Sequence, residues 1–494
     1  MKLVTAMFAT IIGFSEASPA QSEPANESAR DWAAIAITDI RDMHEQTMRH
    51  HPGPHNPLDP DFSERAETAL THALDYARQA DSQVGASFAV RAYAAAYRDG
   101  HYNVYAPTGV STVKWPGMIP VRTNGVWRIH ALTPELAPLD GTELVSCDSQ
   151  APDELMIANL FEFTGNPALR SQWRSLSPYL FLDQSNPFIA LPGTCTFSGV
   201  DGEVEHSLDW SPIDIEAWNE HATPLRRSEN PGFTFTRLED AGFWISFPTF
   251  SPQSNEDNGP SEVDQINQLI ADLELQADEL RDASHIVIDV RGNRGGASAW
   301  GRRIVRAIWG NDYADYRAPA AAEGVDFRVS VENMAHVEWI IEQTVQHEMT
   351  EAEVYFPEVL AGMGQAQTDG APLYREDRPR ADPADPAPNP VNARVYFLTD
   401  GSCGSACLDF ADFMYSLDGV VHIGAETYAD SDYMEFRRTE LPSGLNRLGL
   451  PIKVYRGRAR ESGESYTPEI AYEAEDWSTA ALQDWVATLE AMHD

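Results

Sequence analysis

Two segments of the chain combine small residues with a candidate nucleophile. Residues 286–296 read Ile-Val-Ile-Asp-Val-Arg-Gly-Asn-Arg-Gly-Gly, and residues 395–407 read Val-Tyr-Phe-Leu-Thr-Asp-Gly-Ser-Cys-Gly-Ser-Ala-Cys. Each pattern predicts a buried β-strand that runs into a turn, and the second continues into a helix. In α/β proteins, such strand ends hold reactive groups and anion-binding N–H groups. If both turns meet at one sheet edge, Ser405 could act as a nucleophile while the Gly295 and Gly296 amides hold an oxyanion.

Both segments resemble motifs of the S41 serine peptidases, the tail-specific and tricorn-core family. Members have a strand ending in Asp-Leu-Arg-x-Asn-x-Gly-Gly and, later, a strand leading to a small-residue turn with the catalytic serine. Residues 289–296 nearly match the first motif, and residues 403–407 occupy the turn of the second. The resemblance places the nucleophile at Ser405, with Ser402 as the alternative. It departs at Leu408, where the family often has Glu.

The resemblance also implies an oxyanion hole. It would be formed by the N–H of Ala406, next after the nucleophile, and an N–H of Gly295 or Gly296. Glycine lets the backbone approach a substrate without a Cβ clash. Three polar residues of the first motif are expected to brace the turn rather than react: Asp289, Arg291 and Asn293.

A serine nucleophile needs a base, and S41 enzymes use one of two. One type has a lysine in a Gly-x-x-Thr-Phe-Gly-Lys segment, and the matching residues 424–430 end in Asp430 instead. The chain has three lysines, none of them in this segment: Lys2, Lys114 and Lys453. The sequence therefore argues against a Ser–Lys dyad.

The other type uses an upstream histidine and a downstream glutamate. His101, in an Asp-Gly-His segment, matches that histidine, and an imidazole can accept a proton near neutral pH. The bland interpretation is a histidine at a helix end. Glu464 is the first candidate to orient His101 and Glu461 the second, because residues 460–469 resemble the segment that closes the family core. Either glutamate could also be an ordinary exposed acid.

The composition of the chain bears on where the protein is located and on what it can bind. The 494 residues have a formal net charge of −41, which argues against binding nucleic acid or an anionic membrane. Residues 1–20 are expected to be a signal peptide, with Lys2 before an apolar stretch and Ala-Ser-Pro-Ala at residues 17–20. No later stretch has 18 consecutive apolar residues, so no stable membrane insertion is expected. The expected location is secreted or periplasmic.

Four cysteines permit disulfides in an exported chain. Cys147 could pair with Cys195, whereas Cys403 and Cys407 either form a bond around Ser405 or pack as buried thiols. A zinc site is not expected, because the chain has no Cys-x-x-Cys and residues 347–351 miss the His-Glu-x-x-His pattern. The S41 reaction requires no metal, nucleotide or other cofactor.

The chain divides into regions of different periodicity. Residues 29–108 read as helices, as in the N-terminal region of many S41 proteins. Residues 109–204 are β-rich and form either a PDZ-like module for peptide capture or a small connector. Residues 205–490 alternate strands and helices, with an insertion at 311–390 that could cap the site. We expect a multidomain α/β protein with a crotonase-like (ClpP/crotonase) core.

The leading interpretation is an exported serine endopeptidase that cleaves proteins or peptides through an acyl-enzyme. One rival is a catalytically silent peptide-binding protein on the same fold. Another is an esterase of the α/β-hydrolase class, but that class uses Gly-x-Ser-x-Gly around its nucleophile. The sequence leaves the oligomeric state and the cleavage specificity open.

Overall fold

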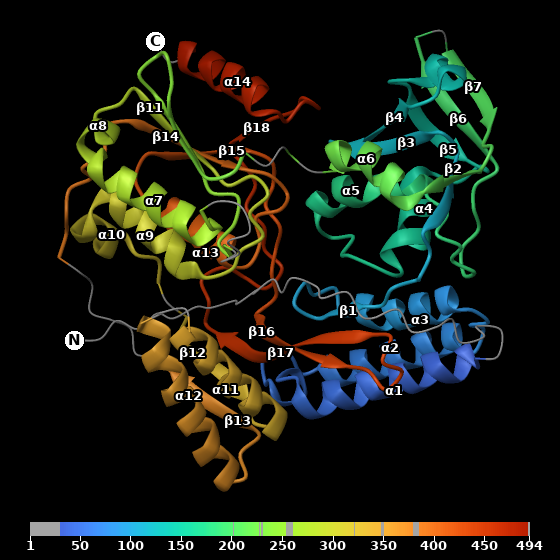
Figure 1. The fold of residues 1–494 in the computed structure, drawn as a ribbon, viewed down its shortest axis with the longest axis horizontal. Helices are drawn as coiled ribbons and strands as arrows, with labels where there is room; N and C mark the ends of the chain where they lie inside the picture. The colour runs from blue at the N-terminus through green and yellow to red at the C-terminus, as the bar shows by residue number, and fades with distance from the viewer. Residues whose placement is uncertain are drawn as a thin grey trace.

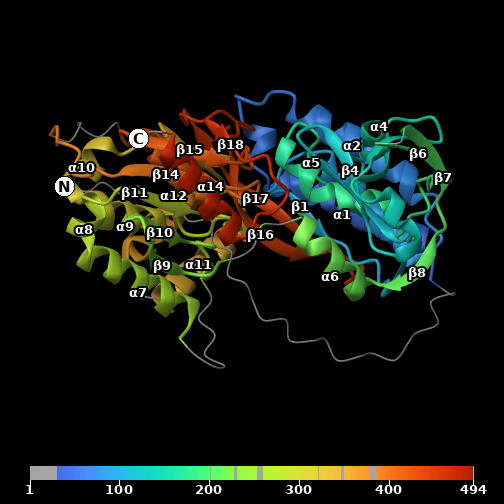
Figure 2. The ribbon, with the colours of Figure 1, turned by 90° about the horizontal axis from the view of Figure 1, so that it is seen from above.

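The computed structural model describes residues 30–200, 202–226, 228, 231–252, 260–320, 322–346, 350–378 and 385–492. It shows a mixed α/β protein of several units, as predicted (Figure 1 and Figure 2). The expected signal peptide, residues 1–20, lies outside the described residues. Within the described ranges, no helix is both long and apolar enough to cross a lipid bilayer.

Helices dominate the N-terminal unit. They are α1 (Trp32–His50), the short turn η2 (Gly53–His55), α2 (Phe62–Ala77) and α3 (Gln83–Ala95). Asp31 caps α1 and Ser82 caps α3, each by accepting a backbone N–H of the first turn. Their apolar faces are buried together with Leu448 and Leu450 of a distant strand. This packing fixes the chain that leaves α3, which contains His101.

A β-rich unit follows. Its antiparallel sheet has the order β3 (Met118–Thr123), β4 (Val126–Ala131), β5 (Glu143–Cys147), β6 (Thr194–Gly199) and β7 (Gly202–Ser207). Its helices and turns are η3 (Pro134–Leu139), α4 (Pro152–Met156), η4 (Ile157–Phe161), α5 (Arg170–Leu176) and η5 (Ser177–Phe181). A disulfide between Cys147 and Cys195 joins β5 to β6.

The β-rich unit continues past residue 204, where the sequence analysis ended it. β8 (Ser211–Asp214) pairs with β2 (Thr112–Trp115). In α6 (Ile215–Arg226), Trp218 and Ala222 are buried among residues of this unit. The structure thus groups β8 and α6 with the β-rich unit, whereas the sequence analysis ended that unit at residue 204.

The next unit has three layers. Its sheet has the order β18 (Ile470–Ala471), β15 (Val420–Gly424), β14 (Arg394–Thr399), β11 (His285–Asp289), β10 (Phe243–Ser246) and β9 (Thr234–Arg237). All neighbours pair in parallel except β9 with β10. One face is covered by α7 (Glu262–Leu275), α8 (Ala277–Arg281), α9 (Ser298–Trp309), α10 (Asn311–Arg317) and α13 (Ala406–Ser416). The other is covered by α14 (Thr479–Ala491), as Figure 1 shows.

A second sheet contains the region predicted to be an insertion. Its order is β1 (Asn103–Tyr105), β17 (Arg447–Arg456), β12 (Gly324–Arg328) and β13 (Leu373–Asp377), with β16 (Tyr433–Glu440) also paired to β17. It is covered by α11 (Val331–Gln346) and α12 (Thr350–Thr368). Residues 311–390 thus complete a sheet, because buried β12 pairs with β17. No described residue of this region lines the site cavity discussed below, so the cap over the site stays a prediction.

An ion pair with no exposed surface braces the end of β11. The Asp289 carboxylate accepts hydrogen bonds from Arg291 Nη2 at 2.7 Å, Trp244 Nε1 at 3.1 Å and Ser246 Oγ at 3.3 Å. Arg291 Nη1 also donates to the carbonyl of Trp477, just before α14. The first motif therefore braces its own turn, as predicted, and ties it to the C-terminal helix.

Removal of the Arg291 charge should strongly destabilise the fold. Arg291→Met leaves the Asp289 carboxylate buried without a cation, so the free energy of unfolding should fall by about 3–5 kcal/mol. The control is Arg306→Met, since that arginine pairs with Asp315 with side chains 42% and 54% exposed. Arg306→Met should change the free energy of unfolding by less than about 1 kcal/mol. Urea unfolding followed by circular dichroism measures both, and equal losses would contradict the bracing role.

Candidate active site

Ser405 lies at the N-terminus of α13 in an unusual backbone conformation. Its φ of +54° and ψ of −124° fall where non-glycine residues rarely lie, so the surrounding structure must hold them there. Asp430 Oδ2 accepts the Ser405 N–H at 2.6 Å. The Ser405 side chain makes no capping bond, and its buried Oγ has no hydrogen-bond partner in the described part of the chain. The hydroxyl is therefore available for chemistry rather than used as a helix cap.

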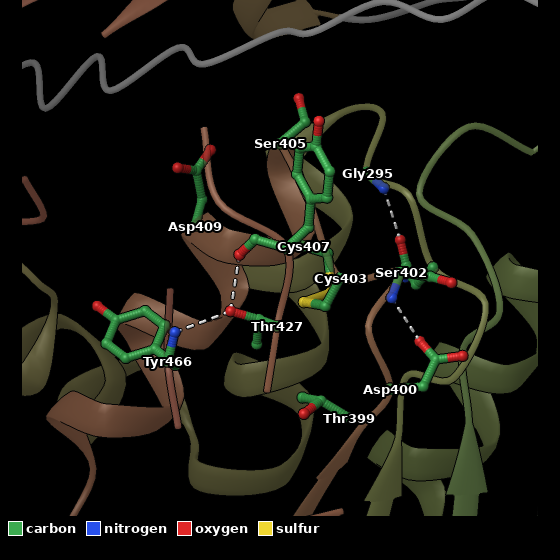
Figure 3. Close-up of a disulfide and its surroundings, with 12 residues drawn as sticks. Gly295, Thr399, Asp400, Ser402, Cys403, Ser405, Cys407, Asp409, Thr427 and Tyr466 are labelled. Carbon is green, nitrogen blue, oxygen red and sulfur yellow. Dashed lines mark hydrogen bonds between the residues drawn. A yellow bond between two sulfur atoms is a disulfide. The ribbon is translucent and has the colours of Figure 1, made fainter. Parts of the chain in front are cut away.

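A disulfide spans the serine turn. Cys403 and Cys407 are both fully buried and bonded, with their Cα atoms 5.2 Å apart. Of the two alternatives left open by the sequence, the structure has the bond. Figure 3 shows the Ser405 side chain directed away from this disulfide. The covalent link limits how far the turn on either side of Ser405 can move.

The two motif turns are in direct contact. A Cβ at Gly295 would lie 2.6 Å from the Gly404 carbonyl oxygen, 2.7 Å from Ser405 Cβ and 2.8 Å from the Ala406 nitrogen. Only glycine fits there, and its φ of +94° is also one that glycine favours. Asp400 adds a second link, because its Oδ2 accepts the N–H of Gly292 at 3.1 Å. The sheet edge thus brings the two turns together, which the sequence analysis had left as a condition.

Of the three N–H groups predicted to form an oxyanion hole, two have no acceptor in the described structure. The Gly295 N–H already donates to Asn293 Oδ1 at 2.9 Å. For the N–H groups of Gly296 and Ala406, the described residues offer no acceptor. If the turn binds an oxyanion, these two donors are the available ones, and the Gly295 alternative loses its support.

His101 is buried at the start of the segment that leads into β1. Its backbone N–H donates to Asp99 Oδ1 at 2.8 Å, and its Nδ1 lies 3.8 Å from the same oxygen. That separation is too long for a hydrogen bond, and Nδ1 has no partner among the described residues. Burial raises the pKa of Asp99, while the adjacent His101 opposes that rise. Asp99 is the carboxylate that the described structure pairs with His101.

The predicted orienting glutamates have other surroundings. Glu464 is exposed, and its Oε2 accepts the backbone N–H of Glu461 at 2.7 Å. Glu461 is also exposed. Their role as partners of His101 stays a prediction.

One segment connects the serine and the histidine, and the sequence analysis did not recognise its role. Asp430 holds the Ser405 N–H, and the next residue, Ser431, donates its hydroxyl to Asp99 Oδ2 at 2.7 Å. The only sequence signal was an aspartate at the lysine position of the related family. Tyr428 lies between the two sides, because Cβ atoms at Gly100 and Gly404 would lie 2.8 and 3.2 Å from it.

Both candidate catalytic residues line one cavity of about 940 Å³. Its walls include His101, Ser402 and Ser405, and also residues 122–125 and 170–176 of the β-rich unit. Residues far apart in sequence thus face one space large enough for a segment of peptide. The arrangement offers a candidate nucleophile, a candidate base and free N–H donors.

The chain is similar to a known peptidase family and to solved peptidase structures. The model of peptidase family S41 matches residues 245–470. Mature CPAF complexed with lactacystin covers 93% of this chain and 98% of its own, with a TM-score of 0.59 and 12% identity. A second structure of mature CPAF covers 92% and 96%, with a TM-score of 0.58 and 13% identity. At such identity, these structures show a shared fold. None of the curated proteins compared with the chain matches it in sequence.

The matched region contains both motif turns, the disulfide and the Asp430 segment, while His101 precedes it. The family assignment and the shared fold agree with the resemblance first found in the two motifs. Residues 245–470 match peptidase family S41, and the chain is a serine-type peptidase.

Proposed function

We propose that this peptidase is an exported endopeptidase that cleaves proteins or peptides through an acyl-enzyme formed on Ser405. The observation that carries the proposal is the buried, unpartnered Oγ of Ser405, which shares a cavity with His101. A hydroxyl held this way, at a positive φ and beside free N–H groups, suits a nucleophile better than a structural serine.

The reaction follows from these positions. Ser405 Oγ forms a bond to the peptide carbonyl carbon while its proton passes to the imidazole of His101. The N–H groups of Gly296 and Ala406 stabilise the resulting oxyanion. His101 then donates the proton to the leaving amine as the C–N bond breaks. A water molecule, deprotonated by His101, hydrolyses the ester and restores the Ser405 hydroxyl.

A carboxylate should hold His101 in the tautomer that this sequence of steps needs. Two observations favour Asp99. Its Oδ1 lies 3.8 Å from His101 Nδ1, and the same oxygen accepts the backbone N–H of His101. Glu464, the sequence-based candidate, remains the alternative. The two differ in burial, because the Asp99 side chain is 6% exposed whereas Glu464 is exposed.

Two further features support the finer parts of the proposal. Both disulfides fit an oxidising compartment, which supports export. The three-layer unit is proposed to be the crotonase-like core. The β-rich unit is proposed to be the PDZ-like module, with edge strand β7 exposed for strand addition by a peptide.

The second candidate is a catalytically silent peptide-binding protein on this fold. It is favoured by one observation: among the described residues, no hydrogen bond joins Ser405 to His101. Catalytic hydrogen bonds are often long before substrate binds, so this geometry alone does not exclude catalysis.

Peptide cleavage by serine variants tests the proposed function. Ser405→Ala should lower kcat/KM on a quenched fluorescent peptide library by at least about 10³-fold, because the nucleophile is lost. Ser402→Ala should stay within about threefold, since the proposed steps do not use that hydroxyl. Circular dichroism verifies that both variants fold. Cleavage retained in Ser405→Ala, or lost in Ser402→Ala alone, would overturn the assignment, and a wild type without cleavage would favour the silent protein.

Substitution of the two candidate carboxylates identifies the residue that orients His101. Asp99→Asn should lower kcat by at least about 10²-fold with little change in KM, because an amide can stabilise the wrong tautomer. Glu464→Gln should have a much smaller effect, since that carboxylate is exposed. Steady-state kinetics on the same peptides measures both, and the reverse order would assign the role to Glu464.

A further inference from the structure

The cavity that holds Ser405 and His101 is unusually basic for this chain. The whole sequence has 35 basic and 76 acidic residues. The cavity lining has more cations than anions: Arg122, Arg170, Arg174, Arg226 and Arg294 against Asp400, Glu426, Asp430 and Glu473. The local balance is thus the reverse of the global one, which favours a substrate with negative charge.

Several of these charges already have partners. Asp400 accepts the N–H groups of Ser402 and Gly292, and Asp430 accepts that of Ser405. Arg122 forms two hydrogen bonds with Asp153, at 2.9 and 3.0 Å. Neither the backbone-bound carboxylates nor this paired arginine leaves a charge fully free for a ligand.

Arg174 is different. It is partly buried on α5, and its guanidinium lies over the ring of Trp477, with Cζ 5.1 Å from the ring centroid. Within the described residues, its side chain has no hydrogen-bond acceptor and no carboxylate in ion-pair contact. Burial lowers the pKa of Arg174, and the more distant Asp400 and Glu475 only partly oppose that effect. An arginine remains charged in a protein, so a partly buried guanidinium without a carboxylate partner is available to bind an anionic ligand.

The position of α5 directs this charge toward the site. A Cβ at Gly401 would lie 2.7 Å from Ser171 Cβ, so α5 packs against the turn that leads to Ser405. Ser171 and Arg174 are three residues apart on α5 and therefore share a face of the helix. Arg174 and Ser405 both line the cavity. A substrate that reaches Ser405 thus passes within the same space as the unpaired guanidinium.

We propose that Arg174 is a specificity-determining residue that binds a carboxylate of the substrate. A guanidinium can donate two parallel hydrogen bonds to a carboxylate, and stacking on Trp477 would hold its plane. The inference rests on the proposed function, because it assigns the ligand of the same cavity. The carboxylate has two possible sources, an acidic side chain or the C-terminus of the peptide.

Binding to the Ser405→Ala protein tests this inference without requiring cleavage. The probes are two matched pairs of randomised ten-residue peptide pools. One pair has Glu or Gln at a fixed position, tested at each position in turn, and the other has a free or an amidated C-terminus. At least one carboxylate form should bind roughly tenfold or more tightly than its neutral match. Adding Arg174→Gln should abolish that preference, and Arg174→Lys should restore part of it.

The control is Arg122→Gln, which removes a paired arginine from the same cavity and should leave the preference intact. Loss of the Glu preference identifies an acidic side chain as the ligand, whereas loss of the free-acid preference identifies the chain end. Equal binding of both forms by the parent, no binding, or a preference that survives Arg174→Gln would overturn the inference. Failure of the wild type to cleave peptides would instead count against the proposed function and leave the binding result valid.

Discussion

The parallel pairing of β11 with β14 is the constraint on which the site depends. It places the ends of two strands side by side, so the turn after Asp289 must meet the turn after Thr399. The contact is closer than any side chain allows, because only Gly295 fits against Ser405 and Ala406. The buried charge pair of Asp289 and Arg291 keeps this edge in place and links it to α14. The nucleophile turn is therefore positioned by the sheet rather than by its own loop.

The histidine reaches the site by a different route. His101 lies in the segment that connects the N-terminal helices to β1, and β1 pairs with β17 of the second sheet. The segment from Asp430 to Ser431 precedes β16 of that sheet and contacts both sides of the site, holding the Ser405 N–H and the Asp99 carboxylate. Two sheets thus supply the two candidate catalytic residues, and one short segment between them sets their relative position.

The sequence predicted the features that are determined by a local pattern of residues. Apolar strands followed by Gly-Gly or Gly-Ser turns identified both motif turns, and helical periodicity identified α1 to α3. The features that depend on pairing between distant segments of the chain were not predicted. The strands of residues 311–390 pair with β17, more than a hundred residues from β12, so the region looked like a cap. Asp430 contributes through one bond to a backbone N–H, and its only sequence signal was its place at the family's lysine position, which does not reveal that bond.

Covalent labelling tests most directly whether Ser405 is the activated nucleophile of this site. The folded wild type is treated with a fluorophosphonate probe, and the modified residue is mapped by mass spectrometry. The account predicts a single modified residue, Ser405, and loss of the label in His101→Ala, because the hydroxyl then lacks its base. Modification at Ser402, or no label on the folded wild type, would contradict it.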